Sequence, residues 1–283
     1  MGDIGIRRGS IADAPALKSL WSRVFGDTDS DIDEFFETFF DVSVCVVAEV
    51  QDTLAAMGFL LPVGFFRSPD KDEVPCGMIY AVATEPSQRG KSCGYAVTRG
   101  LMDDASEHGI DAVVLHPAED SLFEFYSDRV GLETVFYCTQ ERLDISPCDD
   151  IPLQRVSAAE YIAVREKILK DAPHIMFDER CFTYQQRLCG DGGLFAVEFE
   201  DGKKCCAVVE AVTSATVETS NDAVRIIELL GDGETLMSAT ASAIANEFPA
   251  KEYLVRRIGS EVRFGMLNVK LSDQNAWFGL AFD

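Results

Sequence analysis

The feature of this sequence that most constrains its fold is an apolar segment that leads directly into a helix. Residues 76–84, CGMIYAVAT, have the apolar run of a buried strand. The turn that follows, EPSQRGKSCGYA at 85–96, is rich in Arg, Gly and Lys and opens a helix that runs to about His108. Such a turn aims several free backbone N–H groups at one point, where the helix N-terminus adds partial positive charge. The stretch therefore predicts an anion-binding turn between a strand and a helix.

The first half of the chain has the pattern of a mixed α/β unit with the element order βααβββαβαβ. The expected strands are 3–9, 43–50, 54–66, 76–84, 111–117 and 132–143. The expected helices are 11–25, 29–41, 92–108 and 118–130. Gly109 and Gly131 follow the last two helices and are expected to end them.

The second half repeats a similar order of helices and strands. A Pro- and Asp-rich segment at 144–154 interrupts the pattern, so we expect domains at 1–145 and 146–283. The expected helices are 157–170, 178–189 and 234–248. The expected strands are 193–200, 204–212, 223–230 and 252–258, with two late strands near GMLNVKL and WFGLAFD. We therefore expect an α/β (α+β) fold made of two tandem mixed-sheet units.

The charge and the amino-acid composition of the chain indicate which kinds of ligand and partner it can bind. The net charge of −23 disfavours nucleic acid and anionic membranes and favours cationic ligands, although such acidity also serves solubility alone. No apolar run approaches the roughly 18 residues of a membrane span. Nine cysteines without a C-x-x-C pair and only three histidines indicate neither a disulfide framework nor a metal site. We expect a cytoplasmic protein with no bound metal.

The turn at 85–96 contains Gly90-Lys91-Ser92, which matches the end of a nucleotide-binding P-loop. The position that should hold the first glycine of that motif is Glu85, and Pro86 follows it. A carboxylate would repel a triphosphate, and proline lacks a backbone N–H. A short basic turn at a helix N-terminus suits a diphosphate without Mg²⁺, as in coenzyme A.

The same turn resembles a known cofactor loop. Residues 89–94, RGKSCG, resemble the (Gln/Arg)-x-x-Gly-x-(Gly/Ala) loop of the GNAT superfamily of N-acetyltransferases. Arg89 and Gly94 match that loop, and Ser92 replaces the first of its two spaced glycines. Ser92 is also a residue type that caps helix N-termini, and we expect it to cap the helix here.

Two further features support this resemblance. The element order over 3–143 is that of the superfamily. The segment SLFEFYSDRVGLE at 121–133 resembles the fY-x-x-x-GF segment that follows the cofactor loop in that superfamily. We match Tyr126 and Gly131 to the Tyr and Gly of that segment, and Leu132 stands where Phe is usual.

The doubled layout resembles the tandem acetyltransferases of the enhanced-intracellular-survival type. Their second unit lacks a working cofactor loop, and here only Gly231-Asp232-Gly233 separates a strand from the next helix. The second unit is therefore expected to be degenerate and to wall the acceptor cleft. The further sterol-carrier-like domain of those relatives is not expected in this chain.

The resemblance implies transfer of acetyl from acetyl-CoA to a primary amine, on a cationic small molecule or a peptide. The cofactor-binding residues that it implies are Val82, Ala83, Thr84, Arg89, Gly90, Lys91, Ser92, Cys93, Gly94 and Tyr95. Acidic residues at 27–37 form either part of an acceptor site or an ordinary solvated helix face. The alternative function is a non-catalytic, GNAT-like acyl-CoA-binding or scaffold protein, and either protein could form a homo-oligomer.

The resemblance also suggests catalytic groups. Tyr126 is the expected general acid for the leaving thiolate, although it could simply pack against its aromatic neighbours Phe123 and Phe125. The general base has three candidates: Glu85, His116 and the C-terminal Asp283.

Overall fold

The fold was taken from a computed structural model, which describes residues 4–69, 71–211, 223–269, 271 and 275–282. The chain forms two compact units. Unit 1 comprises residues 1–66, 73–135 and 265–272, and unit 2 comprises residues 67–72, 136–264 and 273–283. Among the described residues, no helix is long and apolar enough to cross a membrane.

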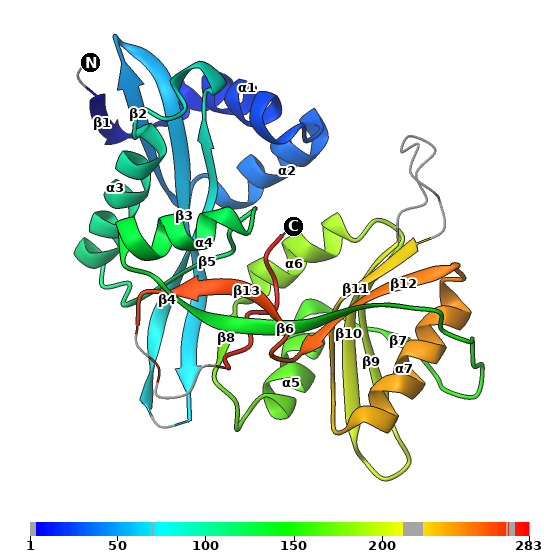
Figure 1. Ribbon diagram of the computed structural model, residues 1–283. Coiled ribbons are helices and arrows are strands. Elements are labelled where there is room, and N and C mark those ends of the chain that lie inside the picture. The colour runs from blue at the N-terminus through cyan, green and yellow to red at the C-terminus, as the bar shows by residue number, and fades with distance from the viewer. Residues whose placement is uncertain (1–3, 70, 212–222, 270, 272–274, 283) are drawn as a thin grey trace. The chain divides into compact units, whose positions relative to one another are not determined.

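Unit 1 is a mixed sheet with helices packed on it (Figure 1). Its strands, in spatial order, are β1 (Ile4–Arg8), β2 (Val44–Val50), β3 (Thr53–Ser68), β4 (Lys71–Thr84), β5 (Ala112–Leu115) and the end of β13 (Val262–Leu267). Its helices are α1 (Ala14–Phe25), α2 (Asp29–Phe39), α3 (Cys93–Glu107) and α4 (Ser121–Phe125). The pairs β1–β2 and β2–β3 are antiparallel, whereas β4–β5 is parallel. The predicted α/β class is confirmed.

Helix α3 lies close to the sheet because one strand residue lacks a side chain. A Cβ atom on Gly58 of β3 would lie 2.9 Å from Val97 Cγ1 and 3.1 Å from Leu101 Cδ1. Both of these α3 residues are completely buried. This close packing fixes the first turn of α3 beside the end of β4, where the predicted turn lies.

Unit 2 also combines a mixed sheet with helices. Its strands, in spatial order, are β6 (Glu133–Leu143), β12 (Glu252–Ile258), β11 (Ala223–Gly231), β10 (Lys204–Ala211), β9 (Gly193–Glu198) and β7 (Gln154–Arg155). Its helices are α5 (Ala158–Ile168), α6 (Glu179–Leu188) and α7 (Glu234–Glu247), and a short strand β8 covers His174–Phe177. The β11–β12 pair is parallel, and β12–β6, β10–β11 and β9–β10 are antiparallel.

The compact units differ from the predicted boundary at 145/146 because each unit includes a strand from the opposite half of the chain. Residues 138–143 of β6 pair with β12, which places them in unit 2. Met266 and Leu267 of β13 pair with β5, which places them in unit 1. Hydrogen bonding between strands distant in sequence sets this division, and composition gives no sign of it.

The expected late strand at WFGLAFD is wrong for the described residues of that segment. Only isolated bridges form, at Ala276 and Trp277. The segment is nevertheless buried in unit 2, and the ring of Phe282 lies 5.1 Å from that of Tyr184. Apolar burial, and not strand pairing, therefore explains its hydrophobic sequence.

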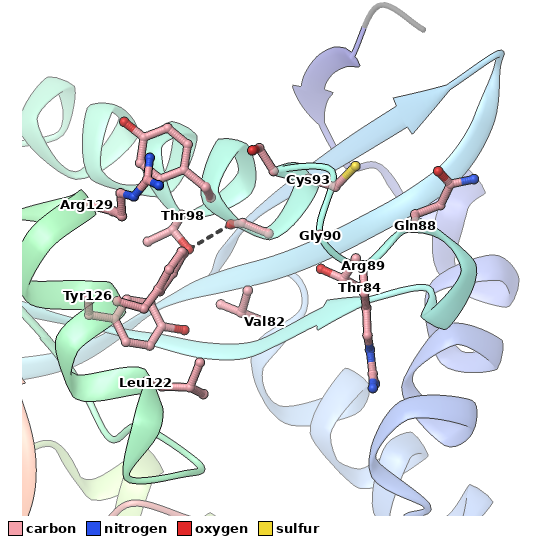
Figure 2. A pocket seen from close by; sticks show the side chains of 14 residues that line it. Val82, Thr84, Gln88, Arg89, Gly90, Cys93, Thr98, Leu122, Tyr126 and Arg129 are labelled. Carbon is pink, nitrogen blue, oxygen red and sulfur yellow. Dashed lines mark hydrogen bonds between the residues drawn. The ribbon is translucent and has the colours of Figure 1, made fainter. Parts of the chain in front are cut away.

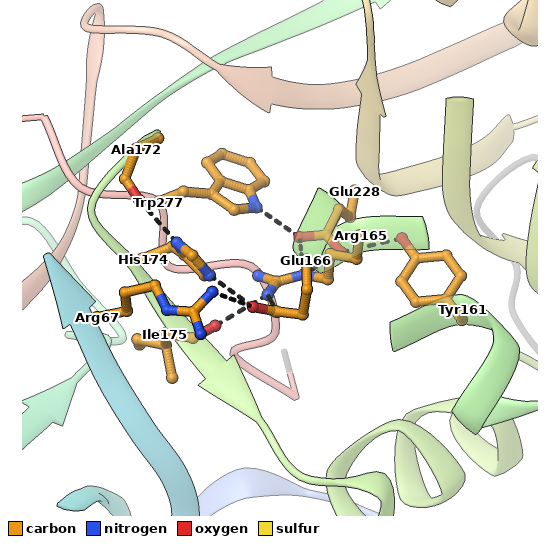
Figure 3. A network of polar contacts seen from close by, with 9 residues as sticks. All are labelled: Arg67, Tyr161, Arg165, Glu166, Ala172, His174, Ile175, Glu228 and Trp277. Atoms are coloured by element: carbon orange, nitrogen blue, oxygen red, sulfur yellow. Dashed lines mark hydrogen bonds and ion pairs between the residues drawn. The ribbon is translucent and has the colours of Figure 1, made fainter. Parts of the chain in front are cut away.

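A buried polar network holds this C-terminal segment (Figure 3). The Glu228 carboxylate accepts hydrogen bonds from Tyr161 Oη at 2.9 Å, from Arg165 Nε at 3.0 Å and from Trp277 Nε1. The side chains of Arg165 and Glu228 are completely buried. Because a buried charge is costly without its counter-ion, the network ties α5, β11 and the C-terminal segment together.

Candidate functional site

A pocket of about 420 Å³ lies in unit 1 where β4, the following turn, α3 and α4 meet (Figure 2). Three elements contribute its lining: the end of β4, the loop with the first turns of α3, and the α4 region. The lining residues are Val82, Thr84, Gln88, Arg89, Gly90, Ser92, Cys93, Gly94, Tyr95, Thr98, Leu122, Phe125, Tyr126 and Arg129. The structure thus brings most of the predicted cofactor residues to one place.

Strand β4 presents alternate residues to the pocket. Val82 and Thr84 line it, whereas Ala83 lies on the opposite face and is completely buried. Just before them, Ala81 has a φ of 50°, a left-handed conformation inside a strand. A single residue of this kind is typical of a β-bulge, which interrupts regular pairing and frees main-chain groups beside a site.

The turn before α3 has the backbone expected of a glycine loop. Gly90 and Ser92 both have left-handed conformations, with φ values of 76° and 68°. Ser92 is at the N-cap position, but its side chain makes no capping hydrogen bond, so the predicted side-chain cap is wrong. A glycine would hold this conformation without steric cost, which explains why the resembling loop has glycine at this position.

The first turn of α3 carries the anion-binding potential of the pocket. The N–H groups of Cys93, Gly94 and Tyr95 have no acceptor within the helix, as at every helix start. A Cβ atom on Gly94 would lie 3.0 Å from Thr84 Oγ1, so glycine allows the helix to approach β4 closely. These features leave room at the backbone for a diphosphate.

Two arginines supply formal positive charge. Arg89 extends from the turn and Arg129 from the far side of the pocket (Figure 2). Lys91 is not among the lining residues, and its Nζ donates to Gln88 Oε1 at 3.0 Å. The basic character of the pocket therefore depends on guanidinium groups, which bind phosphate oxygens in a bidentate manner.

Tyr126 opens a π-helical turn, Tyr126–Val130, that continues α4. Four residues separate Tyr126 from Gly131, one more than in the fY-x-x-x-GF pattern, so the predicted match of spacing is wrong. The extra residue is accommodated as a π turn, in which Gly131 N–H donates to Tyr126 O at 3.0 Å. This turn leaves the Tyr126 side chain beside Leu122 of the same helix and facing Val82 of β4 (Figure 2).

Burial determines the protonation of this phenol. The Tyr126 side chain is buried apart from its pocket-facing part, and burial raises its pKa to about 12. Within the described residues no hydrogen-bond partner of its hydroxyl is found. A neutral phenol without a protein partner is available to donate its proton to a bound group.

Two of the three candidate bases, Glu85 and His116, are not among these lining residues. Glu85 Oε2 is 2.8 Å from Arg23 Nη2 of α1, in an ion pair. His116 is half-buried and directly follows β5. Asp283 lies outside the described residues.

Sequence reasoning missed five lining residues: Gln88, Thr98, Leu122, Phe125 and Arg129. Leu122 and Arg129 lie four residues before and three residues after Tyr126, a spacing that places them on its side of the helix, and Phe125 directly precedes it. This periodicity would have identified Leu122 and Arg129. Thr98 is one turn beyond Gly94, to whose carbonyl its hydroxyl donates at 2.9 Å.

The loop between β11 and α7 of unit 2 is short and acidic. It contains Asp232, whose carboxylate accepts from the Lys204 N–H at 3.2 Å, and Glu234 begins α7. Negative charge at this helix start opposes anion binding. The loop is therefore unlike the one in unit 1.

Comparison with known proteins relates the pocket to a family. Residues 5–133 match the family model described as an acetyltransferase (GNAT) domain. Over 93 residues the chain is 31% identical to the L-2,4-diaminobutyric acid acetyltransferase of Nocardia farcinica, a match that covers 31% of this chain and 45% of that protein. The chain thus spans less than half the length of this curated relative.

Solved structures share the fold over nearly the whole chain. A protein of unknown function from Enterococcus faecalis, described as a probable N-acyltransferase, has a TM-score of 0.72 at 14% identity, covering 94% of this chain and 72% of that one. Eis1 from Mycobacterium abscessus has a TM-score of 0.58 at 11% identity, covering 89% of this chain and 65% of that one. At these identities the likeness concerns the fold alone.

Proposed function

Because residues 5–133 match the model of a GNAT acetyltransferase domain, we propose that this chain transfers the acetyl group of acetyl-CoA to a primary amine. The observation that carries the proposal is the pocket itself, where a protonated Tyr126, the start of α3 and Arg89 converge. A diphosphate fits the turn because Gly90 and Gly94 leave its backbone uncovered. When bound, acetyl-CoA supplies the thioester that an amine attacks.

Each part of the pocket has a role in this proposal. The N–H groups of Cys93, Gly94 and Tyr95 at the start of α3, together with the Arg89 side chain, hold the pyrophosphate. Main-chain groups of β4 at Val82–Thr84 align the pantetheine and the thioester beside the distorted residue Ala81. Tyr126 donates its proton to the departing thiolate, for which a neutral phenol is required.

The general base stays among the three predicted groups. Glu85 is the weakest candidate because its carboxylate is held by Arg23. His116 is supported by its place directly after β5, the parallel neighbour of the cofactor strand β4. Asp283 stays a candidate by the resemblance alone, since it lies outside the described residues.

The acceptor class follows from charge and from one relative. The net charge of −23 favours a cationic acceptor, either a small molecule or a peptide. The relative from Nocardia farcinica is named for acetylation of a diamino acid, which is a small primary amine. We assign catalysis to the 1–145 region and regard 146–283 as a degenerate second unit of the enhanced-survival type, supported by its acidic loop.

A thiol-release assay tests this function. Acetyl-CoA mixed with diamines, polyamines, aminoglycosides and basic peptides should release free CoA in the presence of the protein. Tyr126→Phe should lower kcat by about 10²-fold or more, since general acid catalysis typically contributes that much. If no amine in the panel releases CoA, the catalytic proposal is wrong.

A second candidate function is an acyl-CoA-binding module without catalysis. Ser92 favours this alternative. It has a left-handed backbone conformation, and it adds a Cβ atom to the cofactor turn at a position where the GNAT loop has glycine. Calorimetry separates the two functions, since the binding module takes up acetyl-CoA without releasing thiol to any acceptor.

A further inference from the structure

The arginines of unit 1 fall into two groups. Four of them, Arg7, Arg8, Arg23 and Arg99, each form an ion pair with a carboxylate. The other two, Arg89 and Arg129, form no ion pair with any described residue, and both line the pocket. Both are solvent-exposed, so their guanidinium groups are open to an anionic ligand in the pocket.

The two unpaired arginines approach the pocket from different elements. Arg89 belongs to the turn before α3, together with the free N–H groups of that helix. Arg129 belongs to the π-helical turn Tyr126–Val130, on the opposite side of the pocket (Figure 2). The turn and α3 together already provide the donors that a diphosphate needs. Arg129 therefore matches a second anionic centre of the same ligand.

Coenzyme A has such a second centre, the 3′-phosphate of its ribose. We propose that Arg129 binds this 3′-phosphate and so selects CoA thioesters over thioesters of carriers that lack it. The inference rests on the proposed function, because it requires acetyl-CoA in this pocket. The planar guanidinium matches a phosphate monoester in a bidentate manner, which a lysine at the same place would do less well.

Calorimetry with two ligands tests the proposal on the full chain. CoA and 3′-dephospho-CoA are titrated into wild type, Arg129→Ala, Arg129→Lys and Arg89→Ala. Arg129→Ala should weaken CoA binding about 10-fold, the effect of losing a charge-assisted hydrogen bond, and leave 3′-dephospho-CoA binding unchanged. Arg129→Lys should retain part of the preference, and Arg89→Ala should weaken both ligands equally.

Arg99→Ala is the matched control, because Arg99 is an exposed α3 arginine outside the pocket lining. It should change neither affinity. The inference is overturned if Arg129→Ala weakens both ligands equally or affects neither. A wild-type chain that binds neither ligand overturns the proposed function as well, whereas normal CoA binding without any 3′-phosphate preference overturns this inference alone.

Discussion

Replacing Ser92 by glycine tests whether the turn before α3 is built as a cofactor loop. Ser92 has φ 68° and ψ 12°, a conformation that costs a residue with a Cβ atom about 1–2 kcal/mol. Glycine removes this strain but adds about 0.5–1 kcal/mol of backbone entropy to the unfolded state. The net gain is about 0.5 kcal/mol in the free energy of unfolding, which corresponds to about 1–2 °C in Tm.

The effect on cofactor binding should be larger than the effect on stability. Ser92 lines the pocket, so its side chain stands where the diphosphate is proposed to bind. We expect wild type to bind acetyl-CoA in the micromolar range or more weakly, and Ser92→Gly to bind about 3- to 10-fold more tightly, equivalent to about 0.7–1.4 kcal/mol. Calorimetry with acetyl-CoA measures this change directly.

Ser92→Ala is the matched control. It keeps the Cβ and the left-handed strain and removes only the hydroxyl, which makes no capping hydrogen bond. Its Tm should stay within about 1 °C of wild type, because the substitution removes no capping hydrogen bond. A loss of 1 kcal/mol or more in Ser92→Ala, or unchanged binding in Ser92→Gly, would refute the reasoning about this loop.

Three other predictions concern packing, charge and pH. Gly58→Ala should lower the free energy of unfolding, measured by urea denaturation, by about 1–3 kcal/mol, because the new Cβ would meet side chains of α3. Gly5→Ala is the control and should be close to neutral, because a Cβ there has no neighbour nearer than 3.9 Å. Glu228→Ala should cost about 3–5 kcal/mol because it removes the completely buried counter-ion of Arg165 and leaves only the Glu166 carboxylate to compensate that charge. Glu252→Gln, which removes an exposed carboxylate, should cost less than about 1 kcal/mol. Burial raises the pKa of Tyr126 to about 12, whereas an ordinary tyrosine ionises near pH 10. Ionisation of Tyr126 should therefore cause no fall in kcat/KM near pH 10. A fall near pH 10 in wild type that is absent in Tyr126→Phe would contradict the assignment of Tyr126 as the acid. The contribution of the neutral Tyr126 phenol to the free energy of unfolding is complete below about pH 10 and is lost as the pH rises through about 12. Tyr126→Phe should therefore show a smaller fall in the free energy of unfolding over this pH range.

Local patterns in the sequence determined which segments form the elements of unit 1. Apolar runs and helical spacing predicted its strands and helices, because each element must bury one face. The basic turn at 85–96 likewise predicted an anion site at the start of α3, since the free N–H groups of a helix start are a local property. Most pocket residues from this turn and from β4 could therefore be named in advance.

Only the tertiary structure decided how those pieces combine. The pairing of β6 with β12 and of β13 with β5 joins segments more than 100 residues apart, and no local pattern records such a partner. The left-handed conformation of Ser92 and the π turn after Tyr126 are further examples. In both, the backbone conformation departs from what the residue type or the motif led us to expect. The sequence thus determined the chemistry available to the pocket, whereas long-range packing decided which elements meet around it.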